Sequence, residues 1–366
     1  MKVSCTKENL IHGLQVVSHI ASKNITLPVL NNVLLKAHDG ALEVSATNLE
    51  LAVITKIRGK VEEEGAFTVQ AKLLTDFVSL LPDERVDFEL QEQSIRVHAK
   101  NSQTIIKGTE ASEFPLIPTV EKKYEYICLA ADIRAGISQV AFAVSADESR
   151  PDINGALFSV HNKELTLVGT DSYRLAERKV PLQAAGGDHD VIVPSKTLYE
   201  VLRIMGDEQG DVVITVGENQ MVFTFGSTTL ISRTIEGRFP DYTQIIPKSH
   251  KTHVRASAAE CAQAIRTASL FCKSGVNDVT LQFIPDKKEL AISALNNQLG
   301  ENTTVVHAKI TGQNNDAVFN YRYLLDGLSA MNTEEVELTI EDRDSPGVIR
   351  PADGVSYIYV VMPIKQ

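Results

Sequence analysis

Apolar and polar residues alternate along much of this chain, which is the pattern of β-strands that bury one face. Between residues 154 and 176, two such stretches containing Phe158 and Leu167 are joined by a polar turn at residues 161–164. The pattern predicts a β-hairpin. Small and polar residues from Gly169 onward end its second strand.

The same pattern occurs three times along the chain. Residues 31–52 and 277–299 also read as strand, polar turn and strand, followed by a small residue two positions before Asn or Asp. The small residues are Ala46, Gly169 and Ala294, which lie 123 and 125 positions apart. A fixed period of this length indicates that one structural unit is repeated in tandem.

A second landmark has the same period. An apolar residue is followed by proline at Pro115, Pro240 and Pro363, which lie 125 and 123 positions apart. Both landmarks together predict three tandem domains joined by polar segments. We place these domains at residues 1–120, 124–247 and 249–366.

Each repeat also contains two segments whose apolar residues recur every three or four positions, the spacing of a helix with one buried face. The first segment follows the opening strand of the repeat, and the second lies later in the same repeat. Two helices against several antiparallel strands predict an α+β fold for each domain. The six predicted helices are residues 6–22, 71–81, 131–144, 195–205, 257–272 and 320–331.

The composition is that of a soluble globular protein, with 43% hydrophobic and 23% charged residues. No apolar run approaches the roughly 20 residues that span a membrane. The first ten residues lack the apolar core of a signal peptide. We therefore expect a cytoplasmic protein with no membrane partner.

The net charge of −11 argues against a chain that is basic throughout, as nucleic-acid-binding domains commonly are. Net charge does not describe how charges are distributed, however. Acidic residues concentrate in turns and strands, whereas the polar faces of the predicted helices carry basic residues. These faces are either ordinary solvated surfaces or, if the repeat brings the helices to one side, parts of one basic surface. The basic residues are Lys7, Lys72, Arg134, Lys196, Arg203, Arg266 and Arg322.

Searches for catalytic motifs find no phosphate-binding loop, dinucleotide fingerprint, zinc-protease motif or serine-hydrolase motif. No spaced Cys or His set predicts a metal site, and the four cysteines are expected to be reduced thiols. We therefore predict no catalytic residue, metal or cofactor. Two other classes stay open: a hydrolase or transferase that uses Asp171 or the acidic cluster at residues 341–344, and a protein-interaction repeat without a DNA role.

Five segments, in their order and spacing, resemble one family. They are TLPVL at residues 26–30, GTDSYRLA at 169–176, VIVP at 191–194, GRFPDY at 237–242 and YVVMP at 359–363. With them the whole chain resembles the bacterial DNA polymerase III β subunit, the replication sliding clamp. The resemblance implies three DNA-clamp domains, each with two helices packed on antiparallel sheets, that form half of a six-domain ring.

The family's function follows from that ring. The resemblance implies a head-to-tail homodimer that encircles double-stranded DNA without sequence preference, in the cytoplasm at the nucleoid. It implies a processivity factor without catalytic activity, which binds its clients through short linear peptides. An alternative is a protein-interaction scaffold of DNA repair without a sliding ring. The implied clients are the replicative polymerase α subunit, the clamp loader, translesion polymerases, ligase and mismatch-repair proteins.

The resemblance also assigns three groups of residues. The client-peptide pocket would comprise an apolar floor with Tyr173 and Arg174 at its rim, and its residues are Arg150, Ile153, Thr170, Ser172, Tyr173, Arg174, Leu175, Pro240, Gln244, Ile245, Pro346, Val360, Val361 and Met362. The DNA-binding residues, including the basic helix faces, would be Lys23, Asn24, Lys72, Arg134, Arg150, Lys196, Arg203 and Arg266. The dimer interface would join two exposed apolar pairs, Ile105 and Ile106 with Leu270 and Phe271.

Overall fold

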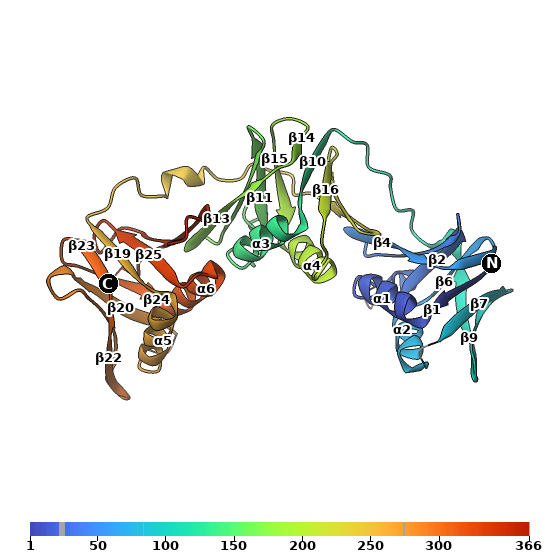
Figure 1. Cartoon of the computed structure of the whole chain (residues 1–366), viewed down its shortest axis with the longest axis horizontal. Coiled ribbons are helices and arrows are strands. Elements are labelled where there is room, and N and C mark those ends of the chain that lie inside the picture. Colours follow the sequence, from blue (N-terminus) through green and yellow to red (C-terminus); the bar gives the residue numbers. More distant parts are fainter. Residues whose placement is uncertain (22–25, 83, 274, 366) are drawn as a thin grey trace. The chain divides into compact units, whose positions relative to one another are not determined.

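The alternating stretches form strands and the helix-period stretches form helices. The computed structural model describes residues 1–21, 26–82, 84–273 and 275–365, and this part of the chain contains 27 strands and six α-helices (Figure 1). The helices are α1 (Lys7–Ser18), α2 (Ala71–Leu80), α3 (Ala130–Ala141), α4 (Ser195–Met205), α5 (Ala258–Ser269) and α6 (Tyr321–Met331). Short 3₁₀ helices lie at Pro28–Asn31, Ala111–Glu113, Tyr242–Gln244 and Pro285–Lys287.

All six predicted helices are confirmed to within a few residues. The first begins after Thr6, whose side chain accepts a hydrogen bond from the amide of Asn9, and buries Leu10 and Leu14. The fifth helix is capped in the same way, because the hydroxyl of Ser257 accepts a hydrogen bond of 3.3 Å from the Glu260 amide. Such caps satisfy amide groups that have no partner inside the helix.

The chain divides into two compact units. The first consists of Met1–Ala131, Gln183–Gly186 and Tyr199–Thr234, and the second of Asp132–Leu182, Gly187–Leu198 and Ile235–Gln366. The residues of the central repeat are therefore shared between the units. The three repeat boundaries stay a prediction from the sequence.

The first unit is built on one antiparallel sheet of 14 strands. Helices α1 and α2 pack against each other, and α1 also packs on β3 and β4. The strands are β1 (Lys2–Thr6), β2 (Asn32–His38), β3 (Ala41–Thr47), β4 (Leu51–Arg58), β5 (Lys60–Glu63), β6 (Gly65–Gln70), β7 (Arg85–Gln91), β8 (Ser94–Ala99), β9 (Ser102–Glu110), β10 (Tyr124–Leu129), β14 (Ala184–Ala185), β16 (Asp211–Val216), β17 (Gln220–Phe225) and β18 (Thr228–Arg233). Their order is β14-β10-β16-β17-β18-β4-β3-β2-β6-β9-β8-β7-β1-β5.

The second unit contains two antiparallel sheets, and α5 packs against α6, β21 and β22 (Figure 1). The strands are β11 (Gly155–His161), β12 (Glu164–Thr170), β13 (Arg174–Pro181), β15 (His189–Pro194), β19 (Thr252–Ser257), β20 (Asp278–Ile284), β21 (Glu289–Asn296), β22 (Gly300–His307), β23 (Lys309–Gly312), β24 (Asn315–Asn320), β25 (Glu335–Ile340), β26 (Gly347–Pro351) and β27 (Tyr357–Val361). The nine-stranded sheet runs β15-β11-β12-β13-β27-β26-β25-β19-β23, and the four-stranded sheet runs β22-β21-β20-β24.

The predicted central hairpin is confirmed. Strands β11 and β12 pair with Phe158 opposite Leu167 and His161 opposite Glu164. Asn162 and Lys163, the two residues of the turn, both have positive φ, which suits the twist of a tight hairpin.

Two strand pairs explain why the units cut across the repeat. In the first unit β4 pairs with β18, which comes from the following repeat. Strand β13 is the equivalent of β4 in the central repeat. In the second unit it pairs with β27, which comes from the following repeat. Each unit is therefore held together by a sheet that continues from one repeat into the next.

Candidate peptide-binding site and charged surfaces

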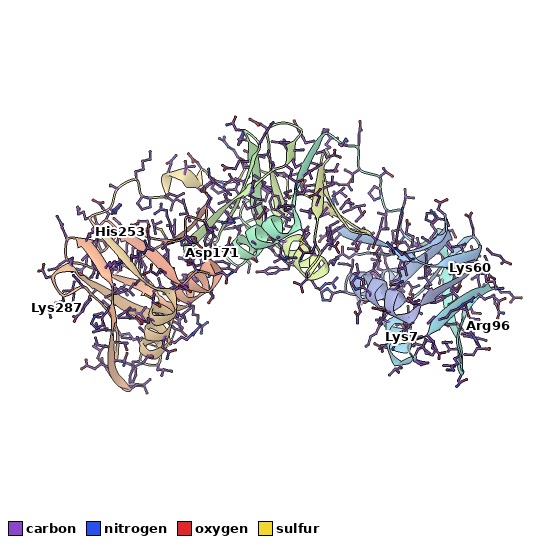
Figure 2. The ribbon with its side chains drawn as sticks, in the orientation of Figure 1. Lys7, Lys60, Arg96, Asp171, His253 and Lys287 are labelled. Carbon is purple, nitrogen blue, oxygen red and sulfur yellow. The ribbon has the colours of Figure 1, made fainter. Side chains whose placement is uncertain are left out.

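The turn between β12 and β13 is held by side chains acting on its own backbone. Asp171, labelled in Figure 2, accepts hydrogen bonds at Oδ1 from the amides of Tyr173 at 2.9 Å and Arg174 at 3.0 Å. The hydroxyl of Thr170 donates to the Arg174 carbonyl at 2.7 Å. Ser172 adopts a positive φ of 77° within this turn. The carboxylate of Asp171 therefore fixes how the next three side chains leave the sheet, which is a structural role.

The guanidinium of Arg174 connects three segments of the second unit. It donates to Asp171 Oδ2 and to the carbonyl of Phe142, both at 3.0 Å, and pairs with Asp326 on α6. It also lies over the Tyr323 ring at 4.5 Å from the ring centroid. The Arg174 side chain is only 12% exposed. Arg174 is therefore largely engaged inside the unit, and its role in a client pocket stays a prediction.

Next to this turn lies a buried apolar cluster built by β11, β12, β13, β15, β26 and β27, by the turn before β11 and by the segment after β18. It consists of Ile153, Leu157, Val168, Leu175, Ile192, Phe239, Val348 and Val360, with Ile235, Tyr242, Ile246 and Ile358 packed against it. We call these residues the second-unit cluster. The predicted pocket residues Ile153, Leu175 and Val360 belong to it and are each 1% exposed.

Other predicted pocket residues are exposed beside the second-unit cluster. Arg150 donates from Nη1 to the Ser172 hydroxyl at 2.8 Å. The exposed ring of Tyr173 stacks on Tyr323 with centroids 6.4 Å apart. The amide of Met362 donates to the Tyr173 carbonyl at 2.9 Å, so the chain leaves β27 alongside the turn.

Of the remaining predicted pocket residues, Val361 and Thr170 are buried, Pro346 is half-buried, and Pro240 and Ile245 are exposed. The structure thus brings the predicted set together within one unit. Its members divide into a buried floor and an exposed border.

The segment after β18 contributes more than the sequence indicated. Phe239 packs edge-on against Tyr242, with centroids 6.3 Å apart, and both contact the second-unit cluster. Burial raises the pKa of the Tyr242 hydroxyl above its usual value, and a hydrogen bond with Glu177 raises it further. Phe239 and Tyr242 belong to the GRFPDY segment that resembles the family, but the sequence did not assign either residue to the pocket. The apolar residues on both sides of Pro240 were the available signal.

Gln244 is held by its neighbours at this border. Its amide donates to Asp241 Oδ2 at 2.7 Å, and the Thr243 hydroxyl donates to Asp241 Oδ1 at 2.7 Å. Both bonds lower the pKa of the Asp241 carboxyl, and the bond from the Thr243 hydroxyl has the larger effect. Gln244 therefore presents a fixed carboxamide at the surface.

Two of the predicted DNA-binding lysines are exposed and paired with acidic residues. Lys72 on α2 lies 2.9 Å from Asp76, one helical turn away. Lys196 at the start of α4 lies 2.9 Å from Glu148. Exposed pairs of this kind contribute little to stability. Both lysines can therefore exchange these partners for phosphate at small cost.

Arg203 on α4 has a structural role. Its guanidinium donates to the carbonyls of Gln15 at 3.2 Å and Val16 at 2.8 Å, in the last turn of α1. It also donates to Glu200 at 2.8 Å. These carbonyls have no partner inside the helix, and the negative end of the helix dipole attracts a cation. Sequence alone did not indicate this contact, which joins residues far apart along the chain.

The other predicted DNA-binding residues differ in exposure. Arg150 and Arg266 are exposed, whereas Arg134 on α3 is half-buried. Lys23 and Asn24 lie outside the described residues.

The predicted dimer residues are only partly at the surface. Ile105 on β9 is 56% exposed, but Ile106 is 3% exposed and pairs with Ile95 of β8. Adjacent residues on a strand point to opposite faces, so the two isoleucines cannot form one exposed pair. That part of the prediction is wrong. Leu270, just after α5, is exposed and Phe271 is half-buried.

The acidic cluster at residues 341–344 is a turn. Asp342 accepts hydrogen bonds from the Asp344 amide at 3.1 Å and the Ser345 hydroxyl at 2.7 Å, and Arg343 pairs with Asp316 at 2.7 Å. Within the described ranges, no group of three or more His, Cys, Asp and Glu residues is placed to hold a metal ion. Asp171 likewise serves its own turn and pairs with Arg174.

All four cysteines are thiols rather than disulfides, as expected. Burial raises the pKa of Cys5 and Cys261 to about 12, and that of Cys272 to about 11. Among the described residues, none of the helices has the length and apolarity needed to cross a membrane.

Three domain models of one family match almost the entire chain. They are the N-terminal, central and C-terminal domains of the DNA polymerase III beta subunit, matched by residues 1–118, 130–241 and 243–365. The class of protein is thus a clamp subunit with three domains, in agreement with the repeat.

Individual relatives agree over their full length. The beta sliding clamp of Synechococcus elongatus is 32% identical, with 100% of this chain and 99% of the relative covered. That of Escherichia coli K12 is 29% identical, with both chains fully covered. The chain belongs to the beta sliding clamp family.

Solved structures show the same fold. The Pseudomonas aeruginosa sliding clamp bound to griselimycin has a TM-score of 0.95 at 29% identity, with both chains fully covered. The Bacillus subtilis clamp has a TM-score of 0.95 at 27% identity, and the match covers 100% of this chain and 99% of the Bacillus subtilis chain. The family resemblance and the α+β clamp fold predicted from the sequence are therefore confirmed.

Proposed function

We propose that this chain is a non-catalytic DNA sliding clamp. Two copies close head to tail into a ring of six domains that encircles duplex DNA and tethers the replicative polymerase, in the cytoplasm at the nucleoid. The observation that carries this proposal is family membership over the whole length of the chain. A DNA-repair scaffold without a ring is not favoured, because the relatives matched over their full length are themselves named sliding clamps.

The internal repeat supports the proposed ring closure. Strand β4 pairs with β18, and strand β13 pairs with β27. In each pair the second strand is the last strand of the following repeat. Strand β22 holds the place of β4 and β13 in the third repeat, and in the described chain it lies at a sheet edge with β21 as its neighbour. The corresponding strand of the first repeat is β9. Its N-terminal part pairs with β8, and its pairing with β6 involves only Gly108, Thr109 and Glu110.

In the proposed dimer, β22 of one copy therefore pairs with β9 of the other. This contact uses two different surfaces, so it is heterologous, and such contacts close into a ring when the rotation permits. Pairing also covers the free edge of β22 and the part of β9 that does not pair with β6, which would otherwise invite aggregation. Exposed Ile105 and Leu270 are the apolar residues that we assign to this interface.

For DNA, we propose that exposed Lys72, Lys196, Arg150 and Arg266 contact phosphates, together with Arg134, Lys23 and Asn24. Arg203 contributes less, because its donors already bind α1. A ring holds DNA by enclosing it, so it needs only weak contacts. Dense phosphate binding would instead immobilise the protein and make it strongly dependent on salt.

For clients, we propose that a linear peptide lies over the second-unit cluster, between Tyr173, Ile245 and Met362. Methionine adapts to differently shaped apolar side chains, which suits several partners on one site. The proposed clients are the polymerase α subunit, the clamp loader, translesion polymerases, ligase and mismatch-repair proteins.

The ring is tested by loading the labelled protein onto a nicked circular plasmid with a clamp loader and then cutting the plasmid once. We expect the protein to stay on the circle and to leave within seconds of linearisation, because only enclosure retains it. An uncut plasmid treated with heat-inactivated enzyme is the control. Equal retention on linear and circular DNA would show that no ring encloses the duplex.

A further inference from the structure

The first unit contains a cleft at the same point of the repeat as the second-unit cluster. Its volume is about 250 Å³, and it is lined by the turn between β3 and β4, by residues 115–118, and by β17 and β18. These three segments correspond to the turn after β12, the segment after Pro240, and β26 with β27. The clamp fold therefore contains the same junction between consecutive repeats twice within one chain. We call each of these junctions a joint.

The two turns have the same hydrogen bonds. The hydroxyl of Thr47 donates to the Leu51 carbonyl at 3.0 Å, as Thr170 does in the second unit. Asn48 Oδ1 accepts from the amides of Glu50 at 3.1 Å and Leu51 at 2.8 Å. Leu49 has a φ of 77°, the same value as Ser172.

The side chains at the two joints differ. The position of Arg174, which ties the second unit together, is occupied in the first unit by Leu51, a buried apolar residue without donors. Exposed Leu49 stands where the second unit has Ser172. A bulky residue rarely adopts a positive φ, and the same turn forms with serine, so the geometry does not require leucine there.

Part of the rim of the cleft is apolar. Leu49 is 52% exposed and Leu116 is 93% exposed, and both line the cleft together with Ile117 and Ile231. Single exposed leucines are ordinary, but leucines gathered at the rim of a cleft mark a surface that a partner covers. The volume accommodates the side chains of one or two apolar residues rather than a folded domain.

Backbone groups beside the cleft indicate an extended occupant. Residues 115–118 belong to no strand or helix, and within the described chain the amides of Leu116 and Ile117 donate no hydrogen bond. An extended segment laid along them can pair with these groups, as when a peptide adds to a sheet edge.

The charges of the lining restrict the sequence of that segment. Arg233, at the end of β18, is exposed and forms no ion pair with any residue that the structure describes. A guanidinium in this state is suited to bind a carboxylate with two parallel hydrogen bonds. Glu50 lines the same cleft and repels a second negative charge.

We propose that this cleft binds a short extended segment of a partner protein, with two adjacent apolar residues and a single carboxylate next to them. The apolar side chains enter between Leu116 and Ile231, and the carboxylate pairs with Arg233. The site is separate from the client site proposed in the second unit and does not depend on it.

The test uses the full-length protein with ¹³C-labelled Leu and Ile methyl groups. The probes are the synthetic peptides acetyl-Ser-Asp-Leu-Leu-Ser-amide and acetyl-Ser-Leu-Leu-Asp-Ser-amide, which place the carboxylate on either side of the apolar pair. We expect saturable methyl shifts at Leu49, Leu116, Ile117 and Ile231. Arg233→Glu should weaken binding at least about tenfold, because it replaces a charge-assisted pair by repulsion.

Variants distinguish this site from other exposed apolar surface. Leu116→Asp should abolish the shifts, whereas Leu80→Asp, which changes a similarly exposed leucine of α2 outside the cleft, should leave them unchanged. Peptides with Asn in place of Asp should bind Arg233→Glu and the unmodified protein equally. Shifts confined to Ile153, Leu175 and Ile192 of the second unit, or no shifts at all, would overturn the proposal. Neither result would bear on retention of the protein on circular DNA.

Discussion

Arg174 shows how one residue determines the chemistry of a joint. The turns at residues 47–51 and 170–174 have the same backbone bonds, yet one ends in Leu51 and the other in Arg174. In the second unit the guanidinium links β13 to α6 through Asp326 and packs over Tyr323. Removing one partner from such a largely buried network leaves the remaining carboxylates uncompensated.

We therefore predict that Arg174→Ala lowers the free energy of unfolding by about 3 kcal/mol. Lys179→Ala is the control. It breaks the exposed ion pair of Lys179 with Glu164, which measures 2.7 Å, and should cost about 0.5 kcal/mol or less. Scanning calorimetry of both variants gives the comparison. Similar transition temperatures for the two would mean that Arg174 does not hold the joint.

At the scale of elements, β27 has two roles. It lies between β13 and β26 in the nine-stranded sheet, and Val360 and Val361 are both buried. It also directs Met362 to the border of the second-unit cluster, where the Met362 amide bonds to Tyr173. The C-terminal strand therefore belongs to the core, and only the residues after it are available to a client.

Two truncations separate these roles. Ending the chain after Tyr359 removes two buried valines and should cost about 3–6 kcal/mol, which unfolds much of the second unit. Ending it after Met362 removes the hydrogen bond from the Ile364 amide to the Val318 carbonyl, at 2.7 Å, and should cost about 1 kcal/mol. Urea titrations followed by circular dichroism measure both. If the two truncations are equally stable, β27 is not part of the core.

At the scale of the whole molecule, two strands among the described residues lack the neighbour that their equivalents in the other repeats have. Strands β22 and β9 occupy the places at which the other repeats are joined by β13 with β27 and β4 with β18. The proposed second copy supplies both missing neighbours. A dimer held in this way buries the apolar residues beside these strands, and a charge placed among them is expensive to desolvate.

We therefore predict that the unmodified protein sediments as a dimer, at twice the chain mass of 40.1 kDa. Ile105→Asp and Leu270→Asp should each shift it to the monomer at micromolar concentration. Leu116→Asp, at an even more exposed leucine of the cleft in the first unit, should remain dimeric. Sedimentation equilibrium at several concentrations distinguishes these outcomes. If the Ile105→Asp and Leu270→Asp variants both remain dimeric, the interface lies elsewhere.

Local patterns in the sequence determined much of this structure. The central hairpin and the six helices follow from spacings of two to four residues and from caps such as Ser257, and the three-fold period follows from landmarks 123 and 125 positions apart. The turn at Asp171 also follows locally, since its carboxylate accepts hydrogen bonds from the nearby amides of Tyr173 and Arg174. Family resemblance added the pocket residues, which the fold brings into one unit.

Only the tertiary structure decided which edges and side chains meet across long stretches of chain. Strand pairing placed Ile106 in the core and Ile105 at the surface, although both read as apolar. Folding placed Arg203 on the last turn of α1 and the guanidinium of Arg174 on α6. Pairing of β4 with β18 and of β13 with β27 divided the central repeat between two units. Such contacts depend on which residues are close in space after folding. The spacing of residues along the chain therefore does not predict them.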